Sequence, residues 1–232
     1  MLRFIMINEI KNVYYTKYYS LMVGTKSSGF IGFLAKFPHY LLEKPFRSNK
    51  GLRILEVGGG QGEHLSFVVD DYESYLMTDI NLEQLQNIDL SKFPNVSTEK
   101  MNAELLKSSS DTFDRVISTC LLSHLSNPTG ALLEWRRVVR DGGKISIYLS
   151  TDPSLALRIF RKLSTARKAK HLGFNDYLFF IANEHLNSAH SLIEIIKRVF
   201  GSDLVNFSYR PFFFKSWYLN LVCVVQITVN KK

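Results

Sequence analysis

The chain has 232 residues, of which 46% are hydrophobic and 22% charged, and this composition is typical of a globular protein rather than of a disordered one. The formal net charge of +8 makes an anionic partner expected. No window reaches the roughly 20 apolar residues of a membrane helix, and the N-terminus lacks the order of a signal peptide, so we expect a cytoplasmic protein. The two cysteines lie in apolar segments without metal-site spacing, and we expect free thiols.

The first strong signal in chain order is a short apolar strand that runs into a glycine-rich loop. Glu56 lies near the end of the strand, and Gly58, Gly60 and Gly62 occupy every second position of the loop. Glycines there permit positive φ angles and a close approach between the backbone and a ligand. A dinucleotide-binding turn needs G-x-G-x-x-G, and Glu63 stands where its third glycine would be, so NAD and FAD are disfavoured.

The pattern Glu-x-Gly-x-Gly-x-Gly resembles motif I of the class I methyltransferases, which use S-adenosylmethionine (SAM). In that family a cationic sulfonium lies over the loop and no phosphate is present, so an acidic residue beside the loop is acceptable. The resemblance implies that Glu56, Gly58, Gly60 and Gly62 belong to a SAM site. A tight turn between a strand and a helix is the alternative interpretation of the loop by itself.

A second strand is expected at residues 74–78, followed by Asp79. This carboxylate comes about 20 residues after the loop, where an α/β nucleotide site places its ribose-binding acid. The resemblance extends the cofactor contact to Ile80. Capping of a helix that begins near Asn81 is the alternative role of Asp79.

The rest of the chain continues the alternation of strands and helices. The expected elements are strands at 96–100, 113–118 and 144–149, a helix at 128–140 that Gly142 and Gly143 end, and two C-terminal strands at 203–209 and 219–229. The resemblance implies further cofactor contacts at the ends of the third and fourth strands, from Asn102, Ala103, Ser118 and Thr119.

Such alternation predicts an α/β protein with a parallel sheet, whose ligands bind beyond the carboxyl ends of the strands. The resemblance covers about residues 50–150 and implies a Rossmann-like, doubly wound sheet of seven strands with an antiparallel last strand. We expect a single domain. Its parts are an N-terminal helical cap (1–50), a SAM-binding core (51–150), a helical substrate-covering insert (151–187), and a C-terminal helix with an edge hairpin (188–232).

The covering insert concentrates positive charge. Helical spacing places Arg158, Arg161 and Lys162 on one face and Leu155, Ile159 and Leu163 on another, which predicts an amphipathic helix with a cationic side. Cations favour an anionic acceptor, such as a sugar phosphate, a nucleotide-sugar or a lipid-linked saccharide. A solvated surface helix is the alternative. The residues expected to bind the acceptor are Arg158, Arg161, Arg167, His171 and Asn187.

Methyl transfer to a hydroxyl group requires a residue that takes up its proton. His185 is the preferred base, and Glu184 beside it belongs to the same polar cluster. His124 follows the fourth strand at a position where the resemblance places a Leu-x-His segment. Asp152 could act as a base or as a cation ligand, or it could begin a helix with the proline after it. No second carboxylate stands at ligand spacing, so we expect no metal site.

The resemblance, together with these patterns, implies a SAM-dependent methyltransferase that acts on the oxygen of a small or saccharide-like, anionic acceptor. The covering segment resembles bacterial enzymes of surface-polysaccharide biosynthesis. Methylation of RNA or another nucleic acid is an alternative for a chain with pI ≈ 9.4. However, residues 118–121 lack the Asn/Asp-Pro-Pro-aromatic motif, and we expect no nucleic-acid partner. A non-catalytic, SAM-binding regulatory protein is the other alternative.

The aromatic run at residues 211–218 suggests a third kind of partner. Aromatic and cationic side chains together favour an anionic membrane surface, so peripheral contact at the inner membrane surface is a further prediction. Core packing beneath a loop is the alternative for this run. The sequence patterns do not distinguish a monomer from an oligomer.

Overall fold

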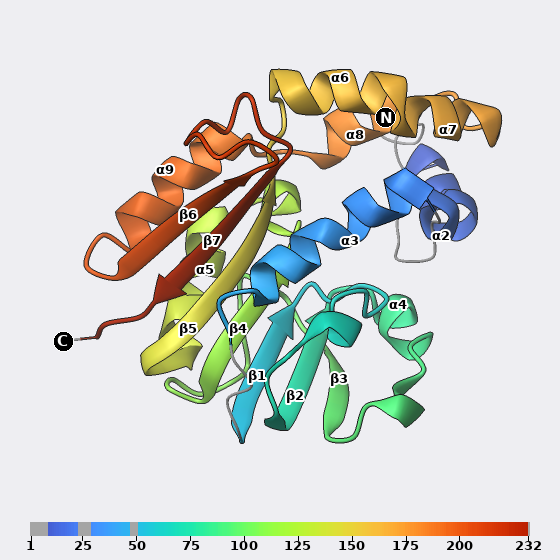
Figure 1. Ribbon diagram of the computed structural model, residues 1–232. Coiled ribbons are helices and arrows are strands. Elements are labelled where there is room, and N and C mark those ends of the chain that lie inside the picture. Colours follow the sequence, from blue (N-terminus) through green and yellow to red (C-terminus); the bar gives the residue numbers. More distant parts are fainter. Residues whose placement is uncertain (1–8, 23–28, 47–50, 232) are drawn as a thin grey trace.

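Figure 1 shows the computed structural model of the chain, which describes residues 9–22, 29–46 and 51–231. Before the sheet lie a π-helical turn (Tyr14–Tyr18), α2 (Tyr19–Met22) and α3 (Gly29–Glu43). The strands are β1 (Leu52–Val57), β2 (Tyr72–Asp79), β3 (Val96–Lys100), β4 (Phe113–Thr119), β5 (Val139–Ser150), β6 (Leu204–Arg210) and β7 (Val222–Thr228). The later helices are α4 (Leu82–Gln86), α5 (Pro128–Val138), α6 (Leu155–Leu163), α7 (Thr165–His171), α8 (Tyr177–Glu184) and α9 (Ala189–Val199).

The seven strands form one sheet in the order β3-β2-β1-β4-β5-β7-β6. Strands β1 to β5 are parallel, and β7 pairs antiparallel with both β5 and β6. The predicted fold class is therefore confirmed. The chain runs outward on opposite sides of β1 and β4, and this reversal creates the crevice in which open α/β sheets bind their ligands.

Helices cover both faces of the sheet and its carboxyl edge (Figure 1). On one face, α5 and α9 bury Trp135, Leu192 and Ile196 against apolar residues of β4, β5 and β7. On the other face, α3 packs Leu42 against the strands. Helices α6, α7 and α8 lie beyond the carboxyl ends of the parallel strands, above the crevice.

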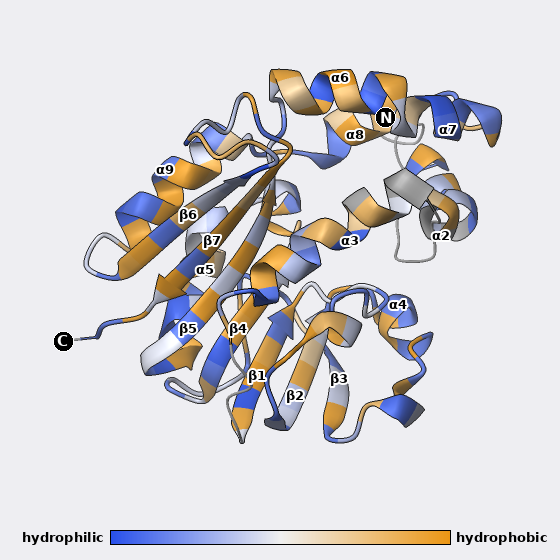
Figure 2. Cartoon of the chain, in the orientation of Figure 1, coloured by the Kyte–Doolittle hydropathy of each residue, from blue (hydrophilic) through white to orange (hydrophobic). Residues whose placement is uncertain are grey.

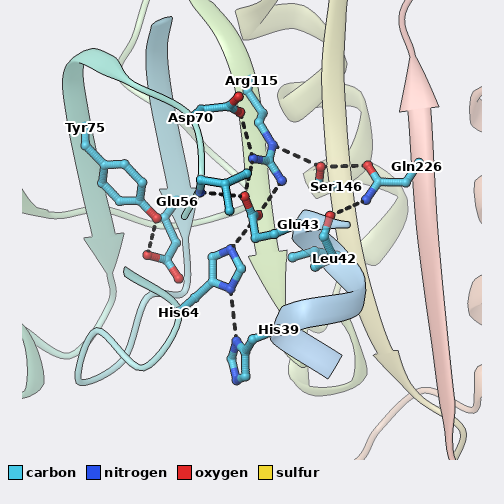
Figure 3. A network of polar contacts seen from close by, with 11 residues as sticks. His39, Leu42, Glu43, Glu56, His64, Asp70, Tyr75, Arg115, Ser146 and Gln226 are labelled. Atoms are coloured by element: carbon cyan, nitrogen blue, oxygen red, sulfur yellow. Dashed lines mark hydrogen bonds and ion pairs between the residues drawn. The ribbon is translucent and has the colours of Figure 1, made fainter. Parts of the chain in front are cut away.

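A buried arginine connects α3 with the sheet (Figure 3). Arg115 lies in the middle of β4, is fully buried, and donates to Glu43 Oε1 over 2.6 Å and to Asp70 Oδ2 over 3.0 Å. Its Nε donates to Ser146 Oγ over 3.1 Å. A buried guanidinium is tolerated only when such partners satisfy its donors. The network therefore fixes where α3 crosses the strands.

The expected alternation of strand and helix fails directly after the glycine loop. Only a 3-10 turn, Leu65–Phe67, separates this loop from β2. Helix α3 packs against this 3-10 turn and against β5 and β7, and a chain of contacts holds it there. His64 Nε2 lies 3.0 Å from Glu43 Oε1, and His64 Nδ1 lies 3.0 Å from His39 Nδ1. Burial lowers the pKa of His39 to about 3, so both rings pack as neutral imidazoles.

The boundary between α5 and β5 also differs from the prediction. The helix ends at Val138 instead of Arg140, and the segment with Gly142 and Gly143 belongs to β5. Phe113 pairs with Val139 and Arg115 with Lys144, so the residues between these partners form a bulge in β5. The two glycines serve that bulge rather than a helix end.

Candidate cofactor and acceptor site

The glycine loop follows β1 at the carboxyl edge of the sheet. Gly58, Gly60 and Gly62 all have positive φ angles, of 71°, 54° and 77°. A Cβ atom on Gly58 would lie 2.8 Å from Leu121 Cδ2, closer than real Cβ atoms approach. The loop therefore needs glycine for its backbone conformation, and a side chain at Gly58 would also require the Leu121 side chain to move.

Asp79 joins the end of β2 to this loop. Its Oδ2 accepts a hydrogen bond from Gly60 N over 3.1 Å, and its Oδ1 accepts one from Asn81 N over 2.8 Å. The cap of α4 is Asn81, whose side chain accepts from Glu83 N, so Asp79 is not the helix cap. Its neighbour Ile80 is an exposed apolar side chain. A carboxylate and an apolar surface thus lie beside the loop.

The other residues predicted to contact a cofactor lie at the ends of β3 and β4. Asn102 is exposed, and its Oδ1 accepts from the backbone of Glu104. Ala103 is buried, and its carbonyl accepts from Trp135 Nε1. Ser118 and Thr119 close β4, where Ser118 is fully buried. All four positions belong to the same edge of the sheet as the glycine loop.

Glu56 lies beneath the loop. It is 1% exposed, and Tyr75 Oη donates to its Oε2 over 2.7 Å (Figure 3). Its Oε1 is buried, and the described residues offer it no hydrogen-bond partner. Burial raises the pKa of Glu56 to about 8 despite the bond from Tyr75. This geometry makes Glu56 a support for the loop from below.

A second polar cluster lies under α6 and α8. His185 Nδ1 is 2.5 Å from Asp152 Oδ2, and Arg161 Nη1 is 2.6 Å from the same oxygen. Burial opposes ionisation of Asp152, but the hydrogen bonds from His185 and Arg161 outweigh it and lower its pKa to about 2. Asp152 is therefore a carboxylate that orients the His185 ring.

The other two predicted catalytic residues lie beside His185. The rings of His124 and His185 meet edge to face, with centroids 4.9 Å apart. Burial and the neighbouring His185 lower the pKa of His124 to about 4. Glu184 accepts from Tyr15 Oη over 3.1 Å and pairs with Lys11 Nζ at 2.9 Å. The structure thus brings all three predicted residues into one cluster.

The five residues predicted to bind the acceptor do not form one group. Arg161 belongs to the His185 cluster, whereas Arg158 on α6 and Arg167 and His171 on α7 are exposed. Asn187 uses its Nδ2 to donate to Leu122 O and Leu125 O. It holds the turn after β4 in place.

Two features of the site have weak sequence signals. Tyr15 connects the N-terminal segment to the His185 cluster through its hydrogen bond to Glu184, and burial, Glu184 and Asp79 raise its pKa. Cys120 follows β4 with a φ of 56°, unusual for a residue other than glycine. Burial raises the pKa of this thiol to about 11, so it is no thiolate nucleophile. In the sequence, only the richness of the N-terminal segment in tyrosine hints at the role of Tyr15. Nothing in the sequence indicates the positive φ of Cys120.

The comparisons with known proteins address the same region of the chain. Residues 55–147, which run from β1 into β5, match a family model described as "Methyltransferase domain". These residues form a class I, SAM-dependent methyltransferase domain. The ubiquinone/menaquinone biosynthesis C-methyltransferase UbiE of Coxiella burnetii is similar, with 30% identity over 118 residues. That alignment covers 47% of each chain, so this chain spans about half the length of the curated relatives it matches.

Solved structures share the fold of this methyltransferase domain at low sequence identity. The CurJ carbon methyltransferase has a TM-score of 0.60 at 15% identity. The aligned part covers 85% of this chain and 55% of the CurJ chain. A possible histamine N-methyltransferase from Thermotoga maritima has a TM-score of 0.59 at 16% identity, over 85% and 92%. The [4+2]-cyclase SpnF has a TM-score of 0.60 at 13% identity, over 88% and 85%. The activities for which these three proteins are named differ, so the fold alone does not identify the chemistry.

The cofactor of this domain family is SAM, and the residues of the loop fit it. Asp79 is a carboxylate held at the loop, with acceptor capacity left for ribose hydroxyls. Ile80, the next residue in the chain, is an exposed apolar side chain that could cover an adenine ring. Within the described residues, no group of three His, Cys, Asp or Glu side chains could hold a metal ion. None of the described helices is long and apolar enough to cross a membrane.

Proposed function

We propose that this methyltransferase domain transfers the methyl group of SAM to a hydroxyl oxygen of a small, saccharide-like, anionic acceptor. The observation that carries this proposal is the contact between His185 and Asp152. Because the ionised carboxylate is an acceptor only, His185 Nδ1 carries the hydrogen of that bond. The lone pair is then on Nε2, where it can receive a proton.

When bound at the glycine loop, SAM would supply an electrophilic methyl group to the acceptor oxygen, and S-adenosylhomocysteine would be the leaving group. His185 Nε2 takes the hydroxyl proton. Asp152 stabilises the imidazolium that forms, and Arg161 fixes the carboxylate in place. His124, held neutral by burial, is a wall of the same cluster and no competing cation.

The anionic character of the acceptor follows from charge. The covering insert presents exposed cations, among them Arg158, Arg167 and His171, the last of these when protonated. Arginine binds carboxylates and phosphates with paired hydrogen bonds. A role in the biosynthesis of surface-polysaccharide precursors and a cytoplasmic location remain predictions from the sequence.

Carbon methylation is the second candidate, because the Coxiella burnetii relative is named a C-methyltransferase. A base at His185 could equally remove a proton from an activated carbon. The two candidates differ in their product. A methyl group on oxygen and one on carbon have well-separated ¹³C chemical shifts, so the bond formed can be read directly.

The test uses the whole chain with SAM labelled with ¹³C in its methyl group. Candidate acceptors are sugar phosphates, nucleotide-sugars, lipid-linked saccharides, quinol precursors and RNA. We expect label in an oxygen-bound methyl of an anionic saccharide, together with release of S-adenosylhomocysteine. Label in RNA or on carbon would overturn the proposed acceptor. If SAM binds and no acceptor class takes up label, the proposal fails in favour of the non-catalytic, SAM-binding protein.

A further inference from the structure

Helix α6 has an apolar face that packs against nothing in the core. None of its nine residues is buried. Leu155, Ile159 and Leu163 repeat every fourth residue along one side and are 40%, 52% and 62% exposed. Figure 2 shows the resulting alternation of hydrophobic and hydrophilic residues along this helix. An amphipathic helix whose apolar side faces outward needs a partner on that side.

The connection between β6 and β7 exposes aromatic side chains beside this helix. Phe213 is 87% exposed, and Phe212 and Phe214 are about half exposed. Asn220 shapes the connection: its Oδ1 accepts from Phe212 N over 2.8 Å, and its Nδ2 donates to Phe214 O and to Ser216 O. Because a fully buried side chain holds this backbone, the outward position of the phenylalanines is built into the fold.

An open apolar groove of about 860 Å³ joins the helix to this connection. Its walls include Ile159, Phe160 and Leu163 from α6, Leu172 after α7, and Phe212 and Leu221 from the connection. Lys168 and His171 line the groove as well. No lining residue belongs to the glycine loop or the His185 cluster, so the groove lies apart from both; among its lining residues only His171 is also expected to bind the acceptor.

The charge around this apolar surface has a single sign. Residues 153–175, which contain α6 and α7, include six Lys or Arg and no Asp or Glu; of these, Arg161 pairs with Asp152 and is not available to a partner outside the chain. Residues 204–232, which contain the β6–β7 connection, include four Lys or Arg and no Asp or Glu. Exposed cations that are adjacent in sequence to these apolar side chains include Lys162, beside Leu163 on α6, and Lys215, beside Phe214. Figure 2 shows α7 as strongly hydrophilic next to the hydrophobic stretches of α6.

We propose that the surface made by α6 and the β6–β7 connection, which we call the docking face, binds an anionic lipid bilayer. The phenylalanines and the apolar side of α6 enter the interface between headgroups and acyl chains, and the groove between them receives an acyl chain. The surrounding cations contact lipid phosphates. A second copy of this chain fits poorly, because a two-fold contact would press the same cations together.

The test is co-sedimentation of the full chain with lipid vesicles. We expect binding to vesicles that contain about a third phosphatidylglycerol in phosphatidylcholine, weaker binding as salt is raised, and none to pure phosphatidylcholine. Phe213→Ser and Leu163→Ser each lose apolar insertion, and we expect each to weaken binding about 10-fold or more. Lys215→Gln removes one cation, for which we expect about a 5-fold loss.

Matched controls lie on surfaces away from the docking face. Leu133→Ser removes an exposed leucine from α5, and Arg198→Gln removes an exposed cation from α9. Neither should change vesicle binding. SAM titration of every variant checks that the cofactor half is intact, and it also makes failure of docking distinguishable from failure of the proposed function.

Three outcomes would overturn the docking face as a bilayer site. The first is no sedimentation with either vesicle type, and the second is equal loss of binding for Leu133→Ser and Leu163→Ser. The third is a dimer in solution that Phe213→Ser dissociates, since the surface would then join two copies of the chain. Light scattering on the same samples measures this third outcome.

Discussion

Arg115 Nη2 lies 2.6 Å from Glu43 Oε1 inside the protein, and this contact joins β4 to the end of α3 (Figure 3). Glu43 also accepts from His64, which follows the glycine loop directly. Burial opposes the charge on Glu43, yet its bonds with His64 and Arg115 lower its pKa to about 2. One carboxylate therefore fixes both the helix that covers the sheet and the segment that leads away from the cofactor loop.

Glu43→Gln tests how strongly this network stabilises the fold. Loss of the charge leaves a buried guanidinium incompletely compensated, and we expect about 3–5 kcal/mol lower free energy of unfolding. Urea denaturation measures it. Arg140→Leu is the matched control, because this pair with Asp114 is solvent-exposed on the arginine side and should cost less than about 1 kcal/mol. Equal losses for the two variants would contradict the network's role.

The sequence predicts the sheet well because its signals are local. A few neighbouring residues are enough to recognise each apolar strand, the glycine loop and Asp79. The order of these features along the chain then implies the topology. The Arg115 network has no such signal, because its partners come from segments far apart in the chain. An arginine within an apolar strand gives no indication of which carboxylate it meets.

Asp79→Ala tests the cofactor half of the site. Its carboxylate is tied to Gly60 N and should bind the ribose hydroxyls, so its loss should weaken SAM binding about 10- to 100-fold. Isothermal titration with SAM and S-adenosylhomocysteine measures the change. Asp89→Ala is the control, because Asp89 accepts from the amide two residues later in the same way as Asp79 but lies elsewhere. Unchanged SAM affinity in Asp79→Ala would remove this residue from the cofactor site.

His185→Ala tests the proposed base. We expect kcat to fall by about 10²- to 10⁴-fold while SAM affinity stays the same, with partial rescue by added imidazole. Asp152→Asn should also lower kcat, because an amide donor would turn the ring to the tautomer whose Nε2 already carries a proton. The control is His190→Ala on α9, an exposed histidine. An unchanged kcat in His185→Ala would contradict the role of His185 as the base. The rate would then come from the alignment of the acceptor with the methyl group of SAM.

The covering insert shows where sequence prediction ends. Periodicity correctly predicts an amphipathic helix, and α6 spans the expected residues. Periodicity cannot say which face turns inward, and here Arg161 reaches Asp152 while Leu163 faces outward. That choice depends on Asp152 and His185, which are brought to the helix only by the complete fold.

Glu56→Gln tests the protonation of the carboxyl beneath the glycine loop. Burial raises the pKa of Glu56 from 4.5 to about 8 in the folded chain. Between these two pH values the folded chain keeps the carboxyl proton, whereas the unfolded chain has lost it. The stability from the protonated form is present below pH 4.5 and is lost as the pH rises toward 8. The slope approaches about 1.4 kcal/mol per pH unit.

The measurement is the free energy of unfolding of both proteins between pH 6.5 and 8. Both proteins contain the same buried histidines, so the histidine contribution to the pH dependence cancels in the difference. We expect the native chain to lose stability relative to Glu56→Gln as the pH rises. Glu99→Gln, at a half-exposed position in β3, is the control, and its free energy of unfolding should change with pH in the same way as that of the native chain. A difference independent of pH would mean that Glu56 is ionised in the fold, and that the loop rests on a buried carboxylate.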